Sequence, residues 1–199
     1  MLRTRLLTVA VVFPLFLWAL FGLPTSYWSA LILAFMVIAA HEWARLFDVP
    51  QIGAILFALM MAVVALVLCI GGEYLIPSQG VTQLLCIVAA VFWIVAVPYI
   101  LKNRVRITAV PVALLFGLVA LIPLWAALVK LQSFGPLYVL FAMGIIWLAN
   151  TAAYFSGRAF GKRKLAADIS TGKTLEGAYG AVTIAVLYSA IFVSLGQYF

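Results

Sequence analysis

The sequence predicts an all-α integral membrane protein, a helical bundle with about seven transmembrane helices and a cytoplasmic N-terminus. The first observation is composition: 68% of the 199 residues are hydrophobic and only 9% are charged. A soluble domain has roughly 45–50% apolar and about 25% charged residues. The second observation is that the apolar residues form unbroken runs, whereas strands of a membrane β-barrel alternate apolar and polar residues. We therefore expect helices that cross a lipid bilayer.

Each expected helix is an apolar run close to the roughly 20 residues needed to cross the hydrocarbon core. The runs cover residues 6–23, 26–41, 52–72, 80–101, 107–129, 136–156 and 177–198. The first run follows Arg3 and Arg5, as in a secretory signal. Because it lacks a small-x-small cleavage site and further runs follow, we expect it to be retained as a helix. Pro111 and Pro123 leave the ends of the fifth run less well defined.

The basic residues predict the orientation in the membrane. With a cytoplasmic N-terminus, every Lys and Arg except Lys130 falls on the cytoplasmic side, as the positive-inside rule expects. The net charge of +7 therefore lies mostly on that face. Such a face either neutralises anionic lipid or suits a substrate rich in phosphate, and the charge alone does not separate the two.

Two regions of the chain differ in character. Residues 1–135 are expected to be N-terminal transmembrane helices, and residues 136–199 to be transmembrane helices flanking a cytoplasmic substrate-binding loop at 157–176. Asn150 and Tyr154 are expected on one helix face, and polar groups at membrane depth usually face a bundle interior or a cavity. Contact between helices is the alternative. Gly157 and Gly161 would let another helix or a ligand approach closely.

The segment STGKT, residues 170–174, has the residue types of a phosphate-binding loop. A Walker A loop needs a glycine at position 167, where this chain has alanine, so a P-loop NTPase is excluded. Ser170, Gly172, Lys173 and Thr174 can still surround phosphate oxygens. The alternative is an ordinary helix N-cap formed by Thr174.

No metal site is predicted from the residues themselves. The chain has one histidine, in the sequence His41-Glu42. A zinc-protease helix needs a second histidine four residues later, and that position is Arg45.

Taken together, residues 149–177 resemble the signature of the phosphatidate cytidylyltransferases, also called CDP-diacylglycerol synthases. The stretch is ANTAAYFSGRAFGKRKLAADISTGKTLEG. The positions that match the family pattern at fixed spacing are Thr151, Ala153, Tyr154, Gly157, Arg158, Phe160, Gly161, Lys162, Lys164, Leu165, Ser170, Gly172, Lys173, Thr174, Glu176 and Gly177. The HEWARL stretch at residues 41–46 also fits the family.

The resemblance implies a CTP-dependent nucleotidyltransferase of phospholipid biosynthesis. In that family, phosphatidic acid attacks the α-phosphorus of CTP and, with Mg²⁺, gives CDP-diacylglycerol and pyrophosphate. The implied partners are CTP, phosphatidic acid and membrane lipid, with no nucleic acid, and a homodimer is allowed. The implied location is a bacterial-type inner membrane.

The resemblance also implies substrate-binding residues. They are Asn150, Tyr154, Lys162, Lys164, Ser170, Gly172, Lys173 and Thr174. We expect Lys173, Ser170 and Thr174 to contact the nucleotide phosphates. Lys162 and Lys164 would attract the anionic substrates.

The sequence departs from the family pattern at several positions: Ala152 replaces a glycine, Ala167 and Thr171 replace prolines, and Leu175 replaces a tryptophan. Two further departures concern the metal site. Asn150 stands where the family has aspartate, and the later histidine-glycine-glycine and aspartate signature, which supplies carboxylates for Mg²⁺, is not reached before Phe199. We therefore expect a C-terminally incomplete chain. If the reading frame does not continue past Phe199 into that signature, we expect the purified chain to make no CDP-diacylglycerol on its own. The alternative is a non-catalytic membrane homologue that binds lipid or nucleotide. A transporter is disfavoured because the 149–177 pattern has no second copy.

Overall fold

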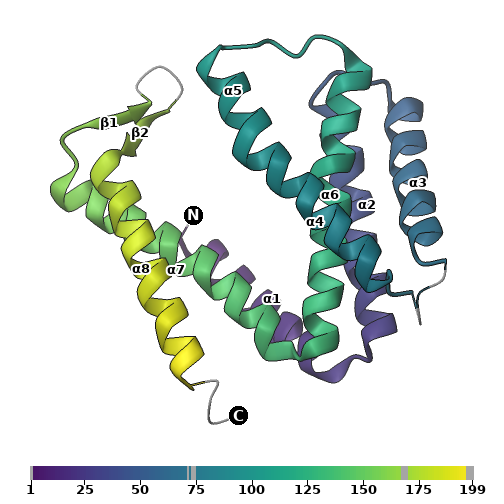
Figure 1. Cartoon of the computed structure of the whole chain (residues 1–199), viewed down its shortest axis with the longest axis horizontal. Helices are drawn as coiled ribbons and strands as arrows, with labels where there is room; N and C mark the ends of the chain where they lie inside the picture. The colour runs from purple at the N-terminus through teal and green to yellow at the C-terminus, as the bar shows by residue number, and fades with distance from the viewer. Residues whose placement is uncertain (1, 71, 73–74, 167–169, 196–199) are drawn as a thin grey trace. The chain divides into compact units, whose positions relative to one another are not determined.

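The structure is a computed structural model that describes residues 2–70, 72, 75–166 and 170–195. Within these residues the chain is helical apart from one short β-hairpin, so the all-α prediction is confirmed (Figure 1). The elements are α1 (Leu2–Gly22), α2 (Thr25–Arg45), α3 (Gln51–Leu68), α4 (Gln79–Val91), the π-helical turn η1 (Phe92–Ala96), α5 (Val97–Lys102), α6 (Val110–Phe134), α7 (Pro136–Phe160), β1 (Lys164–Ala166), β2 (Ser170–Thr174) and α8 (Leu175–Leu195). The segments α4, η1 and α5 run on as a single helix, Gln79–Lys102.

Most of these helices have the length and composition of membrane spans. In the described residues they are Thr25–Arg45, Gln51–Leu68, Gln79–Lys102, Val110–Phe134, Pro136–Phe160 and Leu175–Ser194. Helix α1 also matches an expected span, and its apolar part, Ala10–Gly22, is shorter than the other spans. The predicted runs therefore correspond to the observed helices one by one.

The connection between the last two helices is shorter than the expected loop 157–176. Helix α7 continues to Phe160, and α8 begins at Leu175. An apolar run marks the part of a helix that lies in hydrocarbon, and backbone hydrogen bonding continues beyond it into the polar interface. The remaining connection contains β1 and β2, which pair antiparallel, with Lys164 opposite Thr174.

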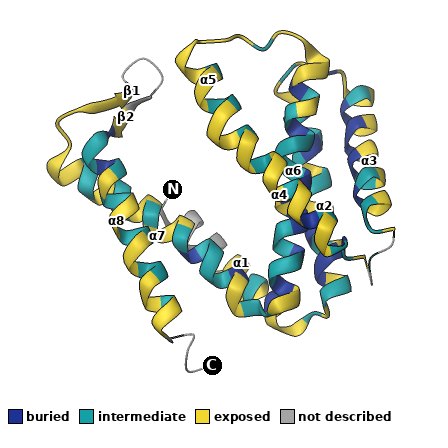
Figure 2. Ribbon diagram, viewed as in Figure 1, coloured by how far each residue is buried: buried dark blue, intermediate teal, exposed yellow. Residues whose placement is uncertain are grey.

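The chain divides into two compact units, Met1–Pro136 and Leu137–Phe199. In the first unit, α2 packs against α3 and α6, and α4 packs against α6. Buried residues gather on α2, α3 and α6, whereas the Gln79–Lys102 helix is largely exposed (Figure 2). Exposed apolar side chains on such a helix are suited to contact with lipid.

Tryptophan side chains join the helices of the first unit. The indole N–H of Trp28 donates to the Leu128 carbonyl oxygen at 3.3 Å, and that of Trp125 donates to the Ser29 carbonyl oxygen at 3.2 Å. Both rings are almost fully buried. Because each indole satisfies its polar group while burying its ring, these contacts fix α2 against α6.

In the second unit, α7 and α8 pack antiparallel. At one end, the rings of Phe141 and Phe192 stack with centroids 4.0 Å apart, and the Tyr188 ring stacks on Phe141 at 5.4 Å. At the other end, the helices are joined by the β1–β2 hairpin. This hairpin end holds the polar residues of the sequence signature.

Candidate functional site

Glycine residues bring the hairpin ends of α7 and α8 into close contact. A Cβ placed on Gly177 would lie 2.8 Å from the Ala153 carbonyl oxygen, well inside contact distance. A Cβ on Gly157 would lie 3.0 Å from the Thr174 hydroxyl oxygen. The expectation that Gly157 permits a close approach is confirmed, and the neighbour is the start of α8.

Thr174 forms the N-cap of α8. Its hydroxyl oxygen accepts a hydrogen bond from the Gly177 backbone N–H at 3.1 Å, and the side chain is buried. The N-cap alternative from the sequence is therefore present in the structure. A hydroxyl has two acceptor sites and one O–H donor, so the cap leaves the O–H of Thr174 able to donate to another group.

The carboxylate of Glu176 binds the turn that follows α7. Its Oε2 accepts hydrogen bonds from the backbone N–H groups of Lys162 at 3.1 Å and Arg163 at 3.3 Å. Its Oε1 accepts one from Arg163 Nε at 3.3 Å. Alongside, the Leu175 N–H donates to the Arg163 carbonyl oxygen at 2.9 Å. These bonds tie the first turn of α8 to the base of the hairpin.

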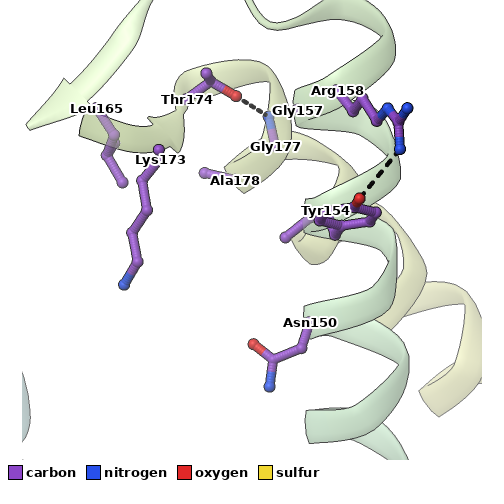
Figure 3. Close-up of a pocket in the computed structure, with 11 residues that line it drawn as sticks. Asn150, Tyr154, Gly157, Arg158, Leu165, Lys173, Thr174, Gly177 and Ala178 are labelled. Carbon is purple, nitrogen blue, oxygen red and sulfur yellow. Dashed lines mark hydrogen bonds between the residues drawn. The ribbon is translucent and has the colours of Figure 1, made fainter. Parts of the chain in front are cut away.

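A cavity of about 480 Å³ lies between α7, the hairpin and the start of α8. Its lining residues are Asn150, Ala153, Tyr154, Gly157, Arg158, Leu165, Gly172, Lys173, Thr174, Gly177 and Ala178. Figure 3 shows the side chains of Lys173 and Asn150 extending into the open space of this cavity. Two cations, an amide and a stretch of accessible backbone would suit an anionic ligand that also has hydrogen-bonding groups.

One face of α7 supplies the wall opposite Lys173. Asn150, Tyr154 and Arg158 follow one another at intervals of four residues, so they project from successive turns of the helix. The Arg158 guanidinium donates from Nη1 to the Tyr154 hydroxyl oxygen at 3.2 Å (Figure 3). This bond orients the guanidinium at the cavity wall.

The cavity contains some of the expected site residues and not others. Asn150, Tyr154, Gly172, Lys173 and Thr174 line it. The remaining expected residues are Lys162, Lys164 and Ser170. Lys162 and Lys164 are exposed and lie outside the lining. Ser170 begins β2, and its side chain lies outside the described part of the structure.

Among the lining residues that were not expected as substrate-binding residues, Arg158 and Leu165 have the largest side chains. The sequence contained a signal for Arg158, because it lies four residues after Tyr154 on the same helix face. Leu165 matches the family pattern, as Arg158 does, but it has no position on a predicted helix face beside the other site residues. It lies in β1, and the hairpin that brings β1 to the cavity was not foreseen.

Comparison with known proteins identifies the family. The model of the Cytidylyltransferase family matches residues 3–199. The chain belongs to this family. A phosphatidate cytidylyltransferase of Pseudomonas aeruginosa is 35% identical over 195 residues, covering 92% of this chain and 67% of that protein. One of Haemophilus influenzae is 32% identical over 211 residues, covering 97% of this chain and 73% of that protein.

A shorter match extends the comparison to other bacteria. A phosphatidate cytidylyltransferase of Bacillus subtilis is 40% identical over 68 residues, which is 34% of this chain and 25% of that protein. No solved structure matches the chain at a significant level. With its family and its long apolar helices, the chain is a multi-pass membrane protein with bacterial homologues.

The family resemblance implies Mg²⁺, and the described residues do not fit such a site. Across residues 2–70, 72, 75–166 and 170–195, no three His, Cys, Asp or Glu side chains group in a way that could hold a metal ion. The acid at the hairpin, Glu176, already accepts hydrogen bonds on both oxygens. Asp168 lies outside the described residues. We therefore derive no reaction step through a metal ion from this site.

Proposed function

We propose that this protein serves as a phosphatidate cytidylyltransferase and that the cavity of the Leu137–Phe199 unit binds CTP. In this reaction a phosphate oxygen of phosphatidate bonds to the α-phosphorus of CTP. The bond from that phosphorus to the oxygen bridging to the β-phosphate breaks, and pyrophosphate leaves with the oxygen. The products are CDP-diacylglycerol and pyrophosphate. Transfer of this kind depends mainly on positioning and on neutralising phosphate charge.

The observation that carries the proposal is that Lys173 and Arg158 line one cavity from opposite elements. Lys173 lies on β2 at its junction with α8, and Arg158 lies in the last turns of α7. A triphosphate between them would meet a positive charge on each side. A Cβ added at Gly172 meets nothing within 4 Å, so a phosphate has room beside the backbone there. In this proposal Thr174 and Ser170 donate hydroxyl hydrogens to phosphate oxygens.

Asn150 and Tyr154 are assigned to the nucleoside end of the ligand. Asn150 has both a carbonyl acceptor and an NH₂ donor, which can pair with the edge of a base. Tyr154 has an aromatic face and is exposed. Lys162 and Lys164 are exposed outside the cavity, so we assign them to long-range attraction of both anionic substrates rather than to direct contact.

The position of the cavity suits a lipid substrate, because the cavity lies at the end of two helices that are long enough to span a membrane. The acyl chains of phosphatidate would remain in the bilayer while its phosphate reaches the cavity. We propose that this end of the helices lies on the cytoplasmic face of a bacterial inner membrane, where CTP is available. Assembly as a homodimer remains a prediction.

Binding of CTP by the purified chain in lipid nanodiscs tests the proposal. Lys173→Gln should raise the Kd for CTP roughly tenfold or more, because a hydrogen bond to a charged group contributes about 1.5–3 kcal/mol. The matched control is Lys130→Gln. Lys130 belongs to α6 in the other unit, and its Nζ lies 5.3 Å from the centroid of the Phe134 ring. The control should leave the Kd unchanged. Failure of the wild-type chain to bind CTP, or an unchanged Kd for Lys173→Gln, would refute the proposal.

The second candidate function is a non-catalytic homologue that binds nucleotide or lipid. It is favoured by the part of the chain that the structure describes, where no three His, Cys, Asp or Glu side chains group to hold a metal ion. The two candidates are separated by incubating the same preparation with CTP, phosphatidate and Mg²⁺ and measuring CDP-diacylglycerol. Product formation supports the enzyme and contradicts the expectation that this chain alone is inactive. Binding of CTP without product is expected both of an incomplete enzyme chain and of the non-catalytic homologue, and these are then separated by whether the reading frame continues past Phe199 into the histidine-glycine-glycine and aspartate signature.

A further inference from the structure

Glu176 lies next to the proposed phosphate-binding residues, and its carboxylate is bonded to the protein itself. We propose that Glu176 is a positioning residue: it holds the hairpin that includes Lys173 against the end of α7, and it is not a metal ligand. The proposal deepens the function proposed above and rests on it, because Lys173 matters only if the cavity binds CTP.

The hydrogen bonds of Glu176 occupy most of what a carboxylate can accept. Oε2 accepts hydrogen bonds from the backbone N–H groups of Lys162 and Arg163. Oε1 accepts a hydrogen bond from Nε of Arg163. A carboxylate has about four lone-pair sites, so at least three are in use. The Glu176 side chain is only 20% exposed, whereas that of Arg163 is 67% exposed. Glu176 is thus partly covered, and both of its carboxylate oxygens are already engaged by the protein.

The bonded groups lie where the chain leaves α7 and enters the hairpin. Helix α7 ends at Phe160, and Lys162 and Arg163 form the turn before β1. Glu176 lies in the first turn of α8, directly after β2. Its carboxylate therefore closes the base of the hairpin, because it bonds to Lys162 and Arg163, which lie 14 and 13 positions earlier in the chain. A negative side chain in the first helical turn is also favoured by the helix dipole.

The base of the hairpin fixes the starting point of Lys173. Thr174 pairs with Lys164 across the two strands, and Lys173 is the preceding residue of β2. The pairing is irregular between Lys164 and Ala166. A short, irregular two-stranded ribbon is not stable by itself, so its position depends on contacts at its base. Removing Glu176 would allow Lys173 to move away from Arg158.

Three variants separate the parts of this contact. Glu176→Ala removes all three hydrogen bonds. Glu176→Gln keeps one oxygen for the backbone N–H groups but places an NH₂ group against Arg163 Nε, where two donors face each other. Arg163→Ala removes only the guanidinium bond and keeps both backbone bonds. The matched control is Glu42→Ala, which removes a carboxylate from α2 whose side chain is 73% exposed.

The first measurement is amide hydrogen exchange in nanodiscs without ligand, read from peptides that cover residues 158–165. In Glu176→Ala the Lys162 and Arg163 amides should exchange about tenfold faster or more, because their acceptor is gone. In Arg163→Ala the Lys162 amide should stay within about threefold of the wild type, because its acceptor remains. Glu42→Ala should match the wild type in this segment.

The second measurement is the Kd for CTP well below the melting temperature of each variant. Glu176→Ala should raise the Kd at least about fivefold in fully folded protein, and Glu176→Gln should raise it less. A purely structural role would lower the melting temperature and leave the Kd of the folded protein unchanged. The Mg²⁺ concentration that gives half-maximal CTP binding should stay the same in the Glu176 variants.

Each result decides the proposal. Unchanged exchange at Lys162 and Arg163 in Glu176→Ala overturns it, as does faster exchange with an unchanged Kd. A shifted Mg²⁺ requirement with unchanged exchange would instead make Glu176 a metal ligand. If the wild-type chain binds no CTP, the proposed function fails, and hydrogen exchange still decides whether Glu176 holds the hairpin.

Discussion

At the residue scale, glycine sets how closely α7 and α8 approach. Gly177 faces the backbone of α7 so tightly that an added Cβ would lie 2.8 Å from the Ala153 carbonyl oxygen. We expect Gly177→Ala to push the helices apart and to destabilise the chain by about 1–3 kcal/mol, as for other overpacked sites. CTP affinity should fall with it, because Gly177 also lines the cavity. Thermal denaturation in detergent and a CTP titration measure the two effects.

A glycine in open space provides the control. A Cβ on Gly80, near the start of α4, meets nothing within 4 Å. Gly80→Ala should therefore leave CTP binding unchanged and keep or slightly raise stability, because alanine is the better helix former. Equal effects of the two substitutions would show that the α7–α8 contact is not the cause.

At the element scale, the start of α8 joins a strand to a helix at Thr174. Thr174→Val keeps the shape of the side chain but removes the oxygen that caps the Gly177 N–H, at a cost of about 1 kcal/mol. We expect faster amide exchange in the first turn of α8 and weaker CTP binding, because the O–H donor is lost as well. Thr174→Ser keeps the hydroxyl and should behave like the wild type in both measurements. Exchange in α8 that is equally fast in both variants would contradict the assigned cap.

The helices could be predicted from sequence more fully than the connection between them. Long apolar runs define membrane helices without knowledge of any partner, and each expected run corresponds to an observed helix. The hairpin could not be foreseen in this way, because KLA and STGKT are short and lack strand-like alternation. Its pairing depends on contacts such as that of Glu176 with Lys162, which exist only once the chain has turned back.

The same limit applies to the candidate site. Fixed spacing along the signature indicated Tyr154 and Lys173, and both line the cavity. Spacing alone could not show that Lys173 lines the cavity and Lys162 does not, because both are exposed cations on one polar segment. What separates them is the turn after α7, where the Lys162 backbone is bound to Glu176. The residue types of such a site can therefore be predicted from sequence. Which of these side chains point into the cavity depends on the local fold.

At the scale of the whole molecule, the placement of charge predicts which side of the membrane faces the cytoplasm. Single cysteines in a background without Cys69 and Cys86 test it with a membrane-impermeant maleimide. Asn103→Cys and Gly172→Cys lie in basic connections and should be labelled only after the cells are permeabilised. Ser133→Cys, three residues after Lys130 and exposed, should be labelled in intact spheroplasts. Labelling of Gly172→Cys from outside would place the CTP-binding cavity away from cytoplasmic nucleotide, so the orientation and the proposed function would then fail together.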